Sequence, residues 1–154
     1  MAMHGGGRLI ATVVVALVVL ASLWYVQAPP RTEGDYRKRA ARTAETLRSQ
    51  LQTTELWVRE LERDRVTQQA AAVGVREAEA DAVTAASEFG EWDPRGDTRF
   101  VRSRLVSLAS EATEALSAIR IAAEDGRWEA LPRLARPLPR LSARFDSFAR
   151  RVDP

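Results

Sequence analysis

The chain has 154 residues and a formal net charge of +2, and it is long enough for one ordinary domain after an apolar leading segment is set aside. It contains no Cys, and its one His, His4, precedes that segment. This composition excludes disulfides, thiolate catalysis, Cys-based zinc sites and any triad or metal cluster built on His within the domain of a single chain.

The first element is the uncharged apolar run "LIATVVVALVVLASLWYV". As a helix it would extend about 27 Å, close to the hydrocarbon thickness of a bilayer, and Trp24 and Tyr25 fall where an interfacial aromatic belt is expected. A cleaved signal peptide is the alternative, but both candidate cleavage sites are poor. The site ending at Ala28 lies directly before a proline, which makes a poor scissile bond, and the site ending at Ala21 is followed by more membrane-like sequence. We therefore predict a tail over residues 1–8 and a single transmembrane anchor, or uncleaved signal, over residues 9–27.

Two patterns disagree on the side of the membrane that the C-terminal domain occupies. Besides the amino terminus, one firm positive charge, Arg8, precedes the apolar run, whereas five basic residues come soon after it, and the positive-inside rule would keep these in the cytoplasm. A short N-terminus before an early apolar run is, however, the usual layout for exporting the domain behind that run. The five basic residues are Arg31, Arg37, Lys38, Arg39 and Arg42.

Residues 28–35, "APPRTEGD", read as a Pro and Gly bearing linker, and residues 36–154 as a helical bundle domain. Apolar residues then recur at alternating spacings of four and three, which predicts an amphipathic helix. The pattern fails at "ERDRVTQQ" and restarts in a new register, so we predict a turn at residues 64–67 between two antiparallel helices. The two predicted seams are Ala40, Ala44, Leu47, Leu51, Thr54, Val58 and Leu61, and Ala71, Val75, Ala78, Ala82, Ala85 and Phe89.

Two further helical segments come after the loop "GEWDPRGDTRF". The third is expected to end near Gly126 in a left-handed conformation, and Pro137 and Pro139 should kink or break the last one. The fold class predicted is all-α: a transmembrane helix followed by an antiparallel four-helix bundle. The third and fourth seams are Val101, Leu105, Leu108, Ala112, Ala115, Ile119 and Ala122, and Leu131, Leu134, Leu138, Leu141, Phe145, Phe148 and Val152.

The last segment carries a stripe of arginines opposite its Leu and Phe seam, if it is read as one helix. From residue 127 to the end there are seven Arg against three acidic residues, a net of +4. Such a stripe could meet anionic lipid headgroups, a polyanionic wall polymer or an acidic protein, and the alternative is a solvated face. Nucleic acid is not expected, because the stripe lacks interleaved aromatic residues and comes after a membrane span. This candidate partner surface comprises Arg133, Arg136, Arg140, Arg144 and Arg151.

Paired carboxylates on shared helix faces, Glu77 with Asp81 and Glu111 with Glu114, could in principle hold a metal or act as acid and base. The helical metal pattern requires Glu-x-x-His, which the chain lacks, so solvated faces are favoured and no metal, cofactor or catalytic residue is expected. Three tryptophans could line a ligand slot, but plugging the core of the bundle is favoured. They are Trp57, Trp92 and Trp128.

The charges of the third helix oppose its dipole, with three Arg residues in its first turns and Glu124 and Asp125 at its end. An antiparallel hairpin would bring Glu88 and Glu91 beside those Arg residues. We therefore expect an intramolecular salt-bridge cluster there. The Arg residues are Arg99, Arg102 and Arg104.

The layout resembles a loose group of small actinobacterial exported or membrane-anchored helical proteins without assigned activity. The resemblance rests on the single apolar segment, the start "DYRKRAARTAETL", the loop "FGEWDP" and the string "LSAIRIAAEDGRWEAL" before a Leu-rich last helix. It implies an export signal and hence an extracytoplasmic domain, and it assigns no functional residue.

These patterns predict a non-catalytic, membrane-anchored binding or scaffolding protein of the cell envelope. Its expected location is the cytoplasmic membrane, crossed once, with the bundle outside. Membrane lipid would hold the span, and an envelope protein or anionic polymer would be the partner of the bundle. The alternative is a tethered four-helix domain that senses a ligand.

Overall fold

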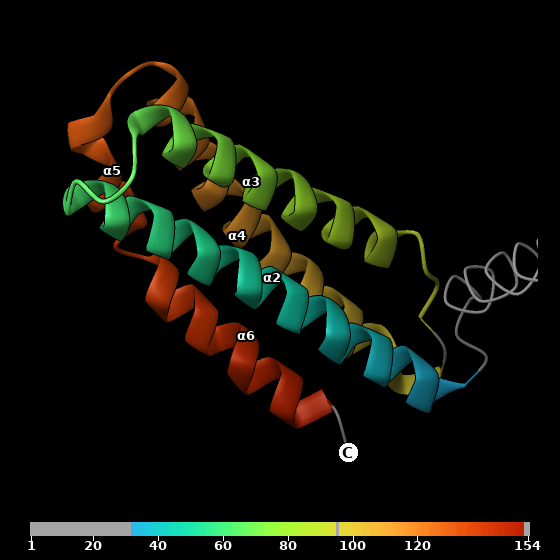
Figure 1. Cartoon of the computed structure of the whole chain (residues 1–154). Coiled ribbons are helices and arrows are strands. Elements are labelled where there is room, and N and C mark those ends of the chain that lie inside the picture. The colour runs from blue at the N-terminus through green and yellow to red at the C-terminus, as the bar shows by residue number, and fades with distance from the viewer. Residues whose placement is uncertain (1–31, 95, 153–154) are drawn as a thin grey trace, which may run out of the picture.

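The computed structural model describes residues 32–94 and 96–152, which form helices joined by short connections (Figure 1). The four long helices run alternately up and down, as the sequence predicted for a helical bundle. Their bounds are α2, Glu33–Glu62; α3, Gln68–Gly90; α4, Arg99–Glu124; and α6, Leu138–Val152. Three short elements complete the described chain: η1, Gly96–Thr98; η2, Trp128–Ala130; and α5, Leu131–Ala135.

The predicted tail over residues 1–8 and anchor over residues 9–27 lie outside the described residues. Among the helices of residues 32–94 and 96–152, none combines the length and the apolar character that a membrane crossing requires.

Helix α2 begins at Glu33, inside the segment predicted as a linker over residues 28–35. The reason is a reciprocal cap: the Asp35 amide donates to Thr32 Oγ1 and the Thr32 amide donates to Asp35 Oδ2, both at 3.1 Å. Two amides of the first turn are satisfied in this way, and the acidic side chains there also complement the helix dipole. The predicted linker is therefore too long at its C-terminal end.

The core follows the predicted seams. All but four of the seam residues are buried, and those four are partly buried at its edge: Leu61, Ala85, Ala115 and Leu134. Two large residues that the seams omitted, Tyr36 and Leu116, are also fully buried. Alanine-rich seams on α3 and α4 leave room for the bulky side chains of α2 and α6.

A reversal joins α2 to α3 where a turn was predicted. Asp64 adopts a left-handed conformation with φ of 53°, which Asp tolerates better than most residues. Thr67 then caps α3 by accepting a hydrogen bond from the Ala70 amide at 3.2 Å. The predicted hairpin is confirmed.

Close packing between these two helices depends on Gly74. A Cβ atom at Gly74 would lie less than 3.0 Å from three atoms of the Trp57 indole, so the ring occupies the space of a missing side chain. Trp57 packs against the core there, as predicted for a core plug.

The α4 end and the proline segment also behave as predicted. Gly126 comes after α4 with φ of 69°, the left-handed region that favours glycine after a helix. Helix α5 ends at Ala135 and α6 begins at Leu138, so the chain breaks at Pro137, which has no amide to donate.

Helix α2 lies at the centre of the contacts, packing on α3, α4 and α6, with the most extensive contact made to α6. Helix α4 packs firmly on α3 but only sparsely on α6. The bundle therefore has one loosely packed edge, between α4 and α6.

Candidate functional site

The proline break divides the predicted arginine stripe. Arg140, Arg144 and Arg151 share the outer face of α6, at spacings of four and seven residues. Arg133 lies on α5 and Arg136 comes next to it in the break, so the five residues do not form one row. All except the half-buried Arg144 are exposed. The stripe was drawn through one continuous helix, whereas α5 ends at Ala135 and α6 begins at Leu138.

Arg144 is committed to an ion pair across the loosely packed edge. Its guanidinium makes two hydrogen bonds to Glu111 of α4, one from Nη2 to Oε1 at 2.9 Å and a shorter one from Nη1 to Oε2. The hydrogen bond from Arg144 lowers the pKa of Glu111, and the same bond raises the pKa of Arg144. Of the predicted surface, Arg144 is thus the member least available to a partner.

A groove of about 480 Å³ runs along the same edge. Its apolar floor includes Ala115 and Leu141, and charged groups from both helices stand at its rim. Arg140 forms no ion pair within the described residues, and the same holds for Arg133, Arg136 and Arg151. The lining residues are Glu111, Glu114, Ala115, Pro137, Arg140, Leu141 and Arg144.

Arg136 faces a different, smaller hollow, of about 150 Å³, against α2. Glu55 and Glu62 line it, together with the cation Arg59. Glu55 is itself paired with Arg59, and Arg136 lies before α6, so the exposed and unpaired arginines of α6 within the described residues are Arg140 and Arg151.

A second groove, of about 400 Å³, lies between α2 and α3. The guanidinium of Arg39 sits 3.8 Å above the ring centre of Trp92, which lines the groove while packing partly on the core. Burial is the main cause that lowers the pKa of Arg39, and the neighbouring Arg42 adds to it. Trp92 thus shares its groove with the two arginines Arg39 and Arg42. Trp128 lines a third groove at the opposite end of the bundle.

One member of each carboxylate pair considered in the sequence has a hydrogen-bond partner on a neighbouring side chain. Asp81 accepts a hydrogen bond from Gln50 at 3.3 Å, and Glu114 accepts one from Ser110 at 3.3 Å. Across residues 32–94 and 96–152, no three His, Asp or Glu side chains gather closely enough to hold a metal ion.

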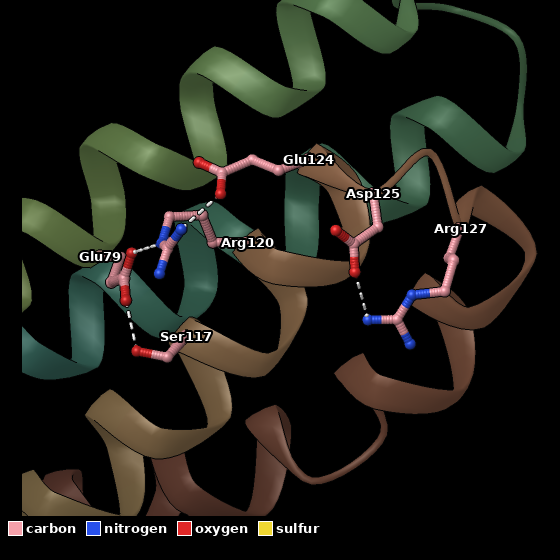
Figure 2. Close-up of polar contacts among 6 residues, drawn as sticks. All are labelled: Glu79, Ser117, Arg120, Glu124, Asp125 and Arg127. Carbon is pink, nitrogen blue, oxygen red and sulfur yellow. Dashed lines mark hydrogen bonds and ion pairs between the residues drawn. The ribbon is translucent and has the colours of Figure 1, made fainter.

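Sequence reasoning missed a polar cluster between α3 and α4, shown in Figure 2. The carboxylate of Glu79 accepts hydrogen bonds from Ser117 Oγ and Arg120 Nε, and Arg120 Nη1 also reaches Glu124 at 2.5 Å. The bond to Glu79 is the main cause that raises the pKa of Arg120. The cluster joins two helices of the bundle, and its side chains are satisfied by one another.

Ion pairs and a hydrogen bond also compensate the charges that oppose the dipole at the ends of α4. Arg120 pairs with Glu124, and Arg127 pairs with Asp125 at 3.0 Å. At the other end, Arg102 donates to the backbone carbonyl of Gly90 at 2.8 Å. No ion pair to Glu88 or Glu91 forms among the described residues, so the expected salt-bridge cluster is wrong: the hairpin brings the carbonyl end of α3, rather than its carboxylates, to the arginine.

Comparison of the chain with family models, curated proteins and solved structures finds no match. The site must therefore be judged from its own geometry.

Proposed function

We propose that this chain is a membrane-anchored helical binding protein of the cell envelope. Residues 9–27 would hold it in the cytoplasmic membrane as a single-pass protein, with the bundle on the outer side. The outer face of α6 would engage an acidic envelope protein or an anionic polymer.

One observation carries this proposal: Arg140 and Arg151 lie on one face of α6, exposed and without an ion pair among the described residues. The opposite side of the helix is anchored in the core by Leu141, Phe145 and Phe148. A rigid element thus presents two solvated cations, which attract an anionic surface without any rearrangement of the fold.

The proposal is tested with the full chain in nanodiscs of neutral lipid, titrated with labelled polyglutamate and with a phosphate-bearing wall polymer. The double variant Arg140→Gln/Arg151→Gln should bind about 30-fold more weakly at low salt, because each charge near a polyanionic surface contributes about 1 kcal/mol. The difference should shrink as salt is added.

A control variant, Arg65→Gln/Arg76→Gln, removes the same charge from the α2–α3 hairpin and should bind like the parent chain. Glu111→Gln/Arg144→Gln removes the ion pair without changing the net charge and should also leave binding unchanged. Equal loss in the α6 and hairpin variants would show that only net charge matters and would reject α6 as the binding face.

Ligand sensing is a second candidate, favoured by the groove between α2 and α3. That groove places Arg39, Arg42 and Trp92 near the start of α2, the helix nearest in sequence to the predicted anchor. A small anion bound there should raise the melting temperature of the parent chain and raise it less in Arg42→Gln. Phosphate and short dicarboxylates are suitable probes, and identical shifts in both proteins would remove this candidate.

A further inference from the structure

The most exposed large apolar side chain among the described residues is Phe100, in the first turn of α4. Its exposed fraction is 78%, whereas the other exposed large apolar side chains range from 37% to 53%. Contact with an apolar environment would remove this phenylalanine surface from water, which is favourable. The described residues of the bundle leave this surface uncovered.

Phe100 lies at the end of the bundle where α2 begins. The Asp97 amide donates to Glu33 Oε1 at 3.3 Å, which places the turn before α4 against the first turn of α2. The last turns of α3 and α6 lie at this same end (Figure 1). Because side chains of a helix tilt toward its N-terminus, Phe100 in the first turn of α4 leans toward the end face of the bundle.

The predicted anchor enters the fold at this same end. From residue 27, where the anchor is expected to stop, to Thr32, the chain can extend at most about 18 Å. The end face of the bundle is thereby held within a short distance of the bilayer surface, provided that the proposed membrane anchor holds.

Arginines flank Phe100 on α4, within an end face that also carries carboxylates. Arg99 and Arg104 are exposed on α4, and Arg151 is exposed in the last turn of α6. Among the acidic groups of the same end, Glu33 accepts the Asp97 amide and Asp35 accepts the Thr32 amide, while Glu88, Glu91, Asp93 and Asp97 are exposed. The arginines that flank Phe100 on α4 have no ion pair among the described residues.

We infer that this end face rests on the lipid bilayer that holds the anchor. Phe100 enters the headgroup region, and Arg99 meets anionic headgroups beside it. Aromatic side chains favour this region, and basic residues gain from anionic lipid there. The bundle is then fixed upright on the membrane, with the α2–α3 and α4–α5 turns at its distant end.

The absence of cysteine from the chain permits a direct test. Single variants Phe100→Cys and Ile121→Cys place the same environment-sensitive dye on two exposed apolar positions of α4, one at each end of the helix. The full chain is reconstituted into vesicles of phosphatidylcholine and phosphatidylglycerol. At position 100 we expect a shift of emission to shorter wavelength, quenching by lipid-borne nitroxide and protection from aqueous iodide. At position 121 we expect free access to iodide and no nitroxide quenching.

Flotation of the vesicles separates the possible failures. If the chain floats with the vesicles but both dyes respond alike, the anchor stands and the end-face contact is overturned. If the chain does not float, the membrane anchor and the contact built on it both fall. Circular dichroism of each labelled protein should match the parent, because both positions are exposed.

Discussion

Tyr36 combines complete burial with a hydroxyl that has no hydrogen-bond partner within the described residues. Its ring packs against Phe89 with centroids 5.4 Å apart, so the side chain serves the core through its ring. Burial raises the pKa of the Tyr36 phenol; nearby Arg102 opposes this increase and Asp93 adds to it.

Replacement of Tyr36 by phenylalanine should therefore not destabilise the fold. In Tyr36→Phe the free energy of unfolding at neutral pH should stay the same or rise by up to about 1 kcal/mol, because an unsatisfied buried hydroxyl is removed and the ring is kept. Urea unfolding of both proteins measures this. A loss of stability in the variant would show that the hydroxyl has a partner.

The same pair of proteins gives a test of pH dependence. A phenol whose pKa is raised by folding contributes stability that is fully present below the unfolded pKa, near 10.0, and is lost as the pH rises through the folded value. The parent chain should thus lose more stability than Tyr36→Phe between neutral pH and pH values above about 10. Parallel curves for the two proteins would contradict the cause assigned to the shift.

A substitution at Gly74 would show how much the close approach of α2 and α3 contributes to stability. Alanine in a helix is normally favoured over glycine by about 0.5 to 1 kcal/mol. At Gly74 the added Cβ would overlap the Trp57 ring, so we expect Gly74→Ala to destabilise the fold by about 1 to 3 kcal/mol through overpacking.

Gly90 supplies the matched control, since it is also a glycine of α3 and a Cβ there would meet nothing within 4 Å. Gly90→Ala should leave thermal stability unchanged or slightly raised. The double variant Trp57→Leu/Gly74→Ala should lose less unfolding free energy than the sum of the losses in the two single variants, because both residues take part in one contact. If the two losses of stability simply add, the effect of Gly74→Ala does not arise from its contact with Trp57.

The helices and their buried faces were readable from the sequence because both arise from local periodicity. Capping at Thr67 and the break at Pro137 also depend on neighbouring residues alone. The arginine stripe was harder, because the break that the prolines predict also separates Arg133 and Arg136 from the helix of the later arginines. A local signal was available there, and it should have divided the stripe.

Contacts between helices were beyond the reach of the sequence. The Arg144–Glu111 pair joins residues 33 positions apart, and the Arg120–Glu79 pair joins residues 41 positions apart. If the helices were rotated differently about their axes, each of these arginines would face other acidic residues. Only the packing of the cores, which fixes how each helix is turned, selects the partner.

The edges of the bundle, where neighbouring helices meet, differ in how closely they are packed. Helices α2 and α6 pack closely, and hydrogen bonds join α3 to α4, so the α4–α6 edge is the loosely packed one. The Trp92 groove lies along the α2–α3 edge. The exposed cations Arg140 and Arg151 stand on α6, beside the loose edge, while Phe100 stands at the end face. The proposed partner surface and the proposed membrane contact thus meet at Arg151, which lies in the last turn of α6.

The dominance of the α2–α6 contact sets the order in which the fold can close during synthesis. Helix α2 is the first of the described helices to be made and α6 is the last, yet they share the largest interface. A nascent chain can form the α2–α3 hairpin early, because its partners are adjacent, but the α6-facing side of α2 stays uncovered until translation is nearly complete. The bundle therefore stays incompletely closed until late in synthesis, which is compatible with the proposed export of this domain.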